Sequence, residues 1–197
     1  MEKKVNCPCL DKEKAISLMH NLLKAFGIQK ESIEEALEPS FIGWFSRSIA
    51  TVIFVFCRDK DGEWCVLAAE RGQDAADFRG FWNCPCGYLD FDERVKECAL
   101  RELYEETGVF IDEDVTEFIG YDDNVESNRQ NVTFRFAAII DDAVTNDFIF
   151  SKEHNEGNEV GEIKWIRVSD VDKYMWAFKH DKLVKEVFEK KVISQKS

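Results

Sequence analysis

Apolar and polar positions follow two different patterns along this chain. Between residues 11 and 38, apolar residues recur at helical spacing with one interruption at Gly27, which predicts two short helices that end before Pro39. From residue 48 onward the pattern changes to β-branched and aromatic runs separated by turn residues, which is typical of strands. The runs that we expect to form strands are 48–56, 63–70, 115–121, 131–140 and 161–168.

Two later segments have helical features. The charged segment after Asp92 can begin with that residue as an N-terminal cap, and Gly108 is a natural stop. Ser169 begins a second helical segment, which we expect to continue to Phe188. Because strands and helices do not alternate regularly, the order predicts an α+β fold with a mixed β-sheet sandwiched between helices. We expect an N-terminal helical extension over 1–40 and one domain over 41–197.

Composition and charge narrow the class of protein. Charged residues make up 33% of the chain and the mean hydropathy is −0.35. We find no run of eighteen apolar residues and no signal-peptide core, so we expect a cytoplasmic protein without membrane contact. The net charge of −13 argues against nucleic acid as a partner, because binding to its backbone needs clustered Lys and Arg. An acidic protein can still hold polyphosphates through divalent cations.

The seven cysteines leave two readings open. Asn-Cys-Pro-Cys occurs at 6–9 and at 83–86, which suggests a four-thiolate zinc site. Structural zinc sites usually place two or more residues between paired cysteines, whereas here only one lies between them. An odd number of cysteines without an export signal favours reduced thiols, and we take that as the plain interpretation.

Acidic residues in the charged segment are spaced for metal binding. Glu102, Glu105 and Glu106 stand at i, i+3 and i+4, so on a helix their carboxylates converge on one face. Carboxylates this close repel one another, which implies a compensating cation. Oxygen ligands without His or Cys suit Mg²⁺ or Mn²⁺. The alternative is an acidic, solvated helix that is held by salt bridges.

The neighbouring residues of this segment support the acidic face. Glu93, Glu97 and Arg101 recur every four positions, so Arg101 can pair with either glutamate and fix the helix rotation that aims Glu102. One turn before Glu102 stand two small residues, which we expect to leave room for metal, water and phosphate. They are Cys98 and Ala99.

The whole stretch from Gly87 to Val109 resembles the Nudix box, Gly-x5-Glu-x7-Arg-Glu-U-x-Glu-Glu-x-Gly-U, where U is aliphatic. The match has no gap, and its flanks agree over roughly 48–190. This resemblance implies the Nudix fold and hydrolysis of a pyrophosphate bond. It also implies that Gly87, Glu93 and Gly108 support the site structurally.

The resemblance implies roles at individual positions. Glu105 and Glu106 would be metal ligands, and Glu102 would be a ligand or a base oriented by Arg101. The main-chain carbonyl before the first box glycine often completes the metal shell, and here it belongs to Cys86, where many members have glycine. That departure is tolerated if the backbone there does not need a positive φ. The residues that we expect to act in catalysis are Glu102, Glu105, Glu159 and Arg101.

A late loop and two arginines complete the expected site. In several Nudix proteins a late-loop carboxylate takes the proton from water, and Glu159 fits that placement best, with Glu156 and Glu162 as alternatives. Arg71 and Arg129 are the expected substrate-binding residues.

The resemblance implies a nucleotide-type small molecule as the substrate. The first hypothesis is Mg²⁺-dependent cleavage of a nucleoside diphosphate linked to another group, such as a dinucleotide or a sugar nucleotide. The alternatives are a nucleoside triphosphate pyrophosphatase and a sensor that binds nucleotide without cleaving it. A homodimer is expected from the family alone, and the substrate and the purpose of residues 1–40 stay open.

Overall fold

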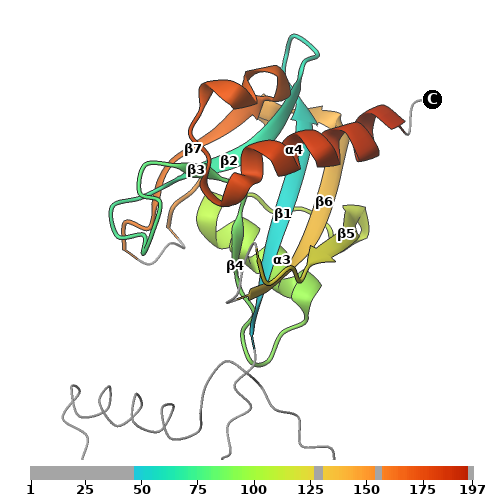
Figure 1. The fold of residues 1–197 in the computed structure, drawn as a ribbon. Coiled ribbons are helices and arrows are strands. Elements are labelled where there is room, and N and C mark those ends of the chain that lie inside the picture. The colour runs from blue at the N-terminus through green and yellow to red at the C-terminus, as the bar shows by residue number, and fades with distance from the viewer. Residues whose placement is uncertain (1–46, 127–130, 154–156, 195–197) are drawn as a thin grey trace, which may run out of the picture. The chain divides into compact units, whose positions relative to one another are not determined.

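The computed structural model describes residues 47–126, 131–153 and 157–194. Figure 1 shows a mixed β-sheet with helices on its two faces. The strands are β1 Ser48–Arg58, β2 Trp64–Arg71, β3 Trp82–Asn83, β4 Cys86–Tyr88, β5 Thr116–Asp122, β6 Asn131–Val144 and β7 Val160–Arg167. The helices are α3 Val95–Thr107 and α4 His180–Phe188. Short helical turns are η2 Glu113–Val115, η3 Thr145–Asp147, η4 Val168–Lys173, η5 Ala177–Lys179 and η6 Glu189–Ile193.

Strand β1 is the centre of the fold because its side chains are buried on both faces. Phe54 and Phe56 point into one core cluster, and Ile53 and Val55 point into the other. All four side chains are fully buried. The continuous apolar run therefore marks a strand that is covered on both sides, as its sequence indicates.

The two edges of β1 have different partners. One edge pairs with β6 in parallel along almost its whole length. The other edge is divided, because β4 pairs antiparallel with Ala50–Val52 and β2 pairs antiparallel with Phe56–Arg58. The main path through the sheet runs β3-β2-β1-β6-β5, and β7 pairs with β2. The start of β4 is thereby fixed beside the middle of β1, where the box begins.

Helices α3 and α4 cover opposite faces of this sheet (Figure 1). Ala99 and Leu103 of α3 lie in the core cluster that contains Ile53, while Val184 and Val187 of α4 lie in the cluster that contains Phe54. The predicted α+β sandwich is confirmed. In the part of the chain that the structure describes, no helix is long and apolar enough to cross a membrane.

Two predicted helical boundaries are wrong. Helix α3 is capped by Arg94 and not by Asp92, because the backbone before Val95 is extended. The segment from Ser169 to Phe188 is not one helix, because positive φ angles at Phe178 and Lys179 break it before α4. The predicted extension over 1–40 lies outside the described residues, and the division at residue 41 stays a prediction.

Candidate active site

Helix α3 has well-defined ends, which fix the positions of its acidic side chains. At its start, the Arg94 N–H donates to the Glu97 carboxylate at 2.8 Å and the Arg94 guanidinium pairs with the same group at 2.6 Å. At its end, Gly108 adopts φ 73° and its N–H donates to the Tyr104 carbonyl at 2.7 Å. This left-handed cap favours glycine, so the predicted stop at Gly108 has a structural cause.

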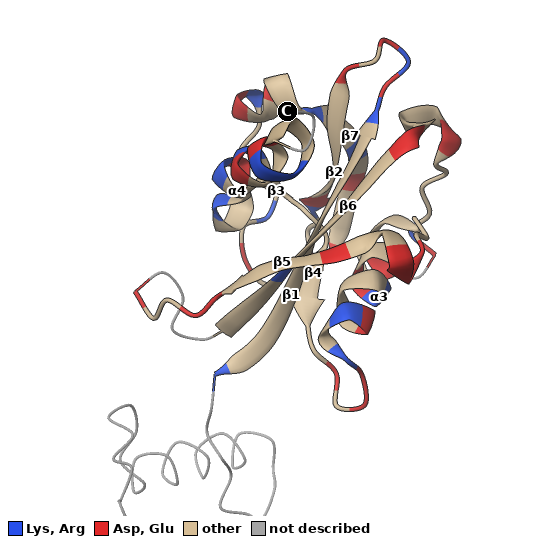
Figure 2. Cartoon of the chain, turned by 90° about the vertical axis from the view of Figure 1, so that its right-hand side faces the viewer, with Lys and Arg blue, Asp and Glu red and all other residues tan. Residues whose placement is uncertain are grey.

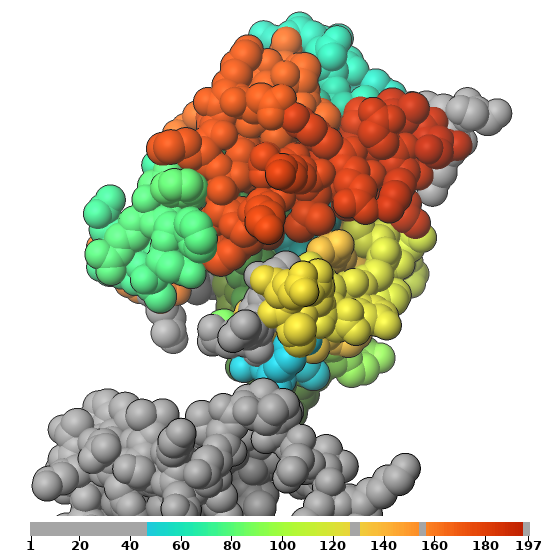
Figure 3. All heavy atoms as spheres, in the orientation of Figure 1, coloured from blue at the N-terminus to red at the C-terminus, as the bar shows by residue number. Residues whose placement is uncertain are grey.

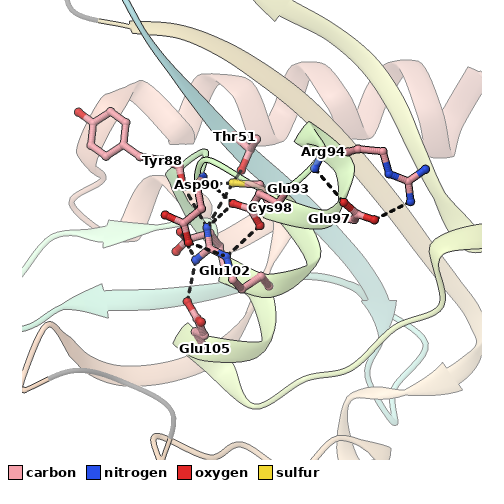
Figure 4. Close-up of polar contacts among 10 residues, drawn as sticks. Thr51, Tyr88, Asp90, Glu93, Arg94, Glu97, Cys98, Glu102 and Glu105 are labelled. Atoms are coloured by element: carbon pink, nitrogen blue, oxygen red, sulfur yellow. Dashed lines mark hydrogen bonds and ion pairs between the residues drawn. The ribbon is translucent and has the colours of Figure 1, made fainter.

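Arg101 connects three carboxylates of the box, those of Glu93, Glu102 and Glu105, which are labelled in Figure 4. Its guanidinium donates to Glu93 at 2.7 Å, to Glu102 at 2.8 Å and to Glu105 at 2.8 Å. It also donates to the carbonyl of Tyr88 at 3.1 Å. Of the two predicted partners it therefore takes Glu93, which lies in the loop before the helix. Arg101 ties that loop to the face that carries Glu102 and Glu105.

One positive charge, on Arg101, faces three carboxylates in this network. The hydrogen bonds from Arg101 hold the pKa of Glu93 below its usual value, and the same bonds raise the pKa of Arg101. Burial raises the pKa of Glu102, although the neighbouring Arg101 acts in the opposite direction. Figure 2 shows further acidic residues along α3 and on the loop before it. A bound cation would relieve the repulsion that remains among these carboxylates.

Gly87 leaves the space that Glu102 occupies. A Cβ atom at Gly87 would overlap with both carboxylate oxygens of Glu102. The prediction that Cys98 and Ala99 leave room for metal and phosphate is wrong, because both are buried against the sheet. The Cys98 thiol contacts the Thr51 hydroxyl at 3.2 Å, which places it in the interface between helix and sheet. The first glycine of the box therefore makes room for the Glu102 carboxylate.

Glu106 meets β4 at Cys86. A backbone hydrogen bond from Cys86 reaches the Glu106 carboxylate, and one of its oxygens is fully buried. Burial, followed by the charge of Glu102, raises the pKa of Glu106 well above its usual value. Cys86 has no positive φ, so its backbone does not require glycine. The departure from glycine at this position is thus compatible with the backbone conformation next to Gly87.

The late loop reaches the site through β2. The Gly72 N–H donates to the carbonyl of Glu159 at 2.6 Å, and a Cβ atom at Gly72 would overlap with the carbonyl of Asn158. The Asn158 N–H donates to the Asp74 carboxylate at 3.0 Å. The charge of Glu159 also raises the pKa of Glu106, which places the two carboxylates within electrostatic range of each other. The backbone contacts at Gly72 and Asp74 thus hold Glu159 within electrostatic range of the box residue Glu106.

The alternative late-loop acids are placed differently. Glu162 is exposed and pairs with Lys164 at 2.9 Å on β7. Glu156 lies outside the described residues. The charge of Glu159, in contrast, is among the main influences on the pKa of Glu106.

The predicted substrate arginines have separate outcomes. Arg71, the last residue of β2, donates to the carbonyl of Asp77 at 2.9 Å and pairs with its carboxylate at 2.5 Å. Its charge lowers the pKa of Glu106, so the guanidinium lies near the acidic face. The predicted Arg129 lies outside the described residues. The structure thus brings Arg71 to the site.

The carboxylates can be tested against the expected cation. In the described part of the chain, no three carboxylate, imidazole or thiol groups converge as a preformed metal cluster. Mg²⁺ binds through one or two carboxylates together with waters and substrate phosphates, so it needs no closed protein cage. Glu102, Glu105, Glu106 and the Cys86 carbonyl offer only oxygen donors, and a bound cation would stabilise the negative charge of the buried Glu106. The donor set therefore fits a hydrated Mg²⁺ or Mn²⁺ ion.

The zinc interpretation concerns two cysteine pairs. Cys84 is fully buried in the core cluster, and the Cys86 thiol accepts from the Asn83 amide at 3.4 Å. Burial raises the pKa of both thiols, which favours their neutral form. Cys7 and Cys9 lie outside the described residues, so the four-thiolate site stays a hypothesis.

Sequence reasoning missed the residues that position the late loop. Gly72 and Asn158 meet although they are far apart in the chain, and Asp74 holds the Asn158 backbone. The available signal was Arg-Gly at the end of a strand together with a late loop rich in Asn, Glu and Gly. Such residues indicate tight turns, but they do not identify which turns touch.

Comparisons with known proteins give the family. The NUDIX domain model matches residues 48–187. Phosphatase NudJ from Escherichia coli strain K12 is 41% identical over 49 residues, which are 23% of this chain and 32% of that protein. The chain therefore spans about a third of the length of the curated relatives that it matches.

Two solved structures are similar in fold. The NUDIX domain of Shewanella oneidensis NrtR, in a cocrystal structure with ADP ribose, has a TM-score of 0.61 and 22% identity, covering 83% of this chain and 99% of that chain. A MutT/nudix family protein from Enterococcus faecalis has a TM-score of 0.62 and 17% identity, covering 89% of this chain and 74% of that chain. The two structures share the fold, and the family-model match over most of the chain shows that the chain belongs to the Nudix domain family.

Proposed function

We propose that this protein is a Mg²⁺-dependent hydrolase that cleaves a nucleoside diphosphate linked to another group, by water attack on phosphorus. The observation that carries the proposal is the acidic face of α3, where Arg101 aligns Glu102 and Glu105 and where Glu106 is buried against Cys86. A similar fold, that of NrtR, holds ADP ribose, which is a compound of this class.

The first role of the site residues is to bind the metal ion. Glu102, Glu105, Glu106 and the Cys86 carbonyl would hold the ion. When bound, the ion neutralises the phosphates, lowers the pKa of its water and stabilises the leaving phosphate.

The remaining roles are proton transfer and binding of the substrate phosphate. Glu159 accepts the proton of the attacking water, because the contact with Gly72 holds its loop near Glu106. Arg71 binds a phosphate oxygen of the substrate.

Substitution of the metal-binding carboxylates tests this assignment. Glu105→Gln and Glu106→Gln should each lower Mg²⁺-dependent hydrolysis of ADP ribose by at least about a hundredfold, because an amide is a poor ligand for a hard cation. The thermal midpoint should not fall, since the neutral side chain relieves like-charge repulsion on α3. Glu113→Gln, on the surface turn η2, is the matched control and should keep full activity. Near-normal turnover in both site variants would refute the metal assignment.

The products distinguish the proposed reaction from its alternative. A conjugate hydrolase releases a nucleoside monophosphate and a second phosphorylated product, whereas a triphosphate pyrophosphatase releases inorganic pyrophosphate. We expect the first pair of products from a panel of conjugates and triphosphates assayed with Mg²⁺. Tight nucleotide binding without any product would instead support a sensor.

A further inference from the structure

We propose that Phe78 and Phe178 form a stacking site for the nucleobase of the substrate, next to the arginine that meets its phosphates. This inference rests on the proposed function and extends it from the diphosphate to the nucleoside. It also gives a role to an exposed aromatic pair that the chemistry of the box does not use.

The first observation is where the backbone is strained. Among the described residues, the only non-glycine positions with positive φ are Phe78 at 48°, Phe178 at 55° and Lys179 at 60°. Bulky residues rarely adopt this conformation, and it costs on the order of 1 kcal/mol or more at each position. All three positions lie in one place, because the rings of Phe78 and Phe178 are 5.0 Å apart.

The second observation is that the two rings are exposed. Phe78 keeps 45% of its surface and Phe178 keeps 41%, whereas Phe54 and Phe56 in the core keep none. The strained backbone therefore does not bury these rings. It presents two apolar rings to solvent, in an edge-to-face arrangement with an interplanar angle of 69°. Exposed aromatic groups next to polar ones are typical of ligand sites.

The third observation is that the two rings are held by separate supports. The loop with Phe78 is closed by the Phe81 N–H, which donates to the Phe78 carbonyl at 3.0 Å. The segment with Phe178 is joined to the sheet by the Trp82 N–H, which donates to the Met175 carbonyl at 2.8 Å. Figure 3 shows the loop of residues 72–81 directly against the segment before α4. Two distant parts of the chain thus form one aromatic surface.

The fourth observation connects the aromatic surface to the carboxylates of the proposed metal site. The Arg71 guanidinium lies over the Phe178 ring at 5.1 Å from its centroid, and the same positive charge acts on the Glu106 carboxylate. One arginine therefore contacts the aromatic pair and is also within electrostatic range of the buried carboxylate. A nucleotide has its charged phosphates at one end and a flat base at the other. Phosphates at Arg71 would direct the base toward Phe178 and Phe78.

The chemistry of the pair also indicates how selective this site is. Phenyl rings offer apolar faces but no hydrogen-bond donors or acceptors that read the edge of a base. Stacking on such rings accepts any base because every base has a π-face. We therefore infer recognition of nucleosides as a class, with little preference between bases.

Binding of two small probes separates this site from the hydrolytic activity. Calorimetry on the full chain would measure adenosine 5′-monophosphate and ribose 5-phosphate, which share the phosphate and differ in the base. In the native protein we expect the base to tighten binding by about tenfold. Phe178→Leu and Phe78→Leu should each remove most of that advantage and leave ribose 5-phosphate binding unchanged. Phe178→Tyr should retain it, because the ring is kept.

The control is Phe118→Leu, since Phe118 is 49% exposed and also packs against aromatic rings, but lies on β5. This variant should bind both probes normally, and thermal midpoints would confirm that all variants fold. The proposal is overturned if the native protein binds the two probes equally, or if both leucine variants keep the advantage of the base. A protein that shows the base advantage but hydrolyses no conjugate would refute the proposed function and leave the stacking site standing.

Discussion

At the scale of single residues, the first glycine of the box matters for the atom that it lacks. A side chain at Gly87 would occupy the place of the Glu102 carboxylate. Gly87→Ala should therefore displace Glu102 and lower turnover about as much as Glu102→Ala does. Because both changes act through one group, the double variant should be no worse than either single variant. Steady-state kinetics of the four proteins would measure this coupling.

The double variant can also contradict this prediction. If the losses of Gly87→Ala and Glu102→Ala multiply, then Gly87 acts by another route, such as the backbone position of Cys86. Full activity of Gly87→Ala would mean that the Glu102 carboxylate can move aside without loss. The thermal midpoints should stay close to each other, because the φ angle at Gly87 does not require glycine.

Residue spacing correctly predicted that Arg101 pairs with a box glutamate, but it did not predict where that glutamate lies. The pairing of Arg101 with a box glutamate is found in the structure, but Glu93 lies in a loop and not on the helix stripe that suggested the pair. Cys98 and Ala99 face the sheet because the apolar side of α3, with Leu103, must be buried. Spacing alone cannot tell a small residue at a helix interface from one beside a ligand.

At the scale of elements, the contact between two loops holds the expected base. The Asp74 carboxylate accepts the Asn158 N–H next to Glu159. Asp74→Ala removes this acceptor and should lower kcat by about ten- to a hundredfold with little change in KM, because small displacements of a catalytic group are costly. Asp74→Asn keeps a carbonyl oxygen and should restore most of the activity. Kinetics of both variants would check the effect.

A different pattern would exclude this positioning role. Equal losses in Asp74→Ala and Asp74→Asn would indicate that charge, and not the hydrogen bond, matters at this position. A change confined to KM would place Asp74 in substrate binding instead.

The elements themselves were predictable where the pattern was long and regular. The runs that form β1, β2, β6 and β7 were recognised from β-branched and aromatic residues. The break before α4 was not recognised, because Phe178 and Lys179 are not residues that normally adopt a positive φ. The conformation occurs together with the ring contact between Phe78 and Phe178, and a local pattern does not contain such a contact.

At the scale of the whole molecule, a buried histidine couples stability to pH. His180 is 4% exposed, and its Nδ1 accepts from the Cys84 N–H at 3.0 Å. Burial, with the charges of Arg135 and Arg71, lowers the pKa of His180 to about 3. The unfolded chain has a histidine pKa of about 6.5 and binds a proton that the folded protein excludes. Above the unfolded-state pKa, the histidine is neutral in both states and burying it has no protonation cost. As the pH falls from there toward 3, only the unfolded chain gains the proton, so the folded protein loses stability.

The expected size follows from this difference in pKa. Between pH 7 and pH 5, His180 should contribute a loss of about 2 kcal/mol in the free energy of unfolding. His180→Asn keeps an acceptor for the Cys84 N–H but has no proton to gain. Between pH 7 and pH 5, the free energy of unfolding of this variant should therefore lack the loss of about 2 kcal/mol that His180 contributes in the native protein. Urea unfolding of both proteins at the two pH values would measure the difference. Parallel pH profiles would show that His180 does not titrate on unfolding.

The overall architecture was predictable for a physical reason. Strands buried on both faces and helices with one apolar side leave few ways to arrange a sandwich. The acidic face of α3 was predictable because carboxylates at i, i+3 and i+4 lie on one side of a helix. The contacts among loops 72–81, 157–159 and 174–180 were not, because short polar loops have no periodicity from which to infer their neighbours.

The parallel pairing of β1 with β6 has a consequence for how the chain folds during synthesis. β1 ends at Arg58, while its parallel partner extends to Val144. The β1–β2 hairpin can close early, but the other edge of β1 stays open until most of the chain has left the ribosome, because closing so long a loop is slow. During that interval an apolar strand has unpaired backbone groups, which favours aggregation. The acidic helix α3 is made in the same interval, and its charge would help to keep the incomplete chain in solution.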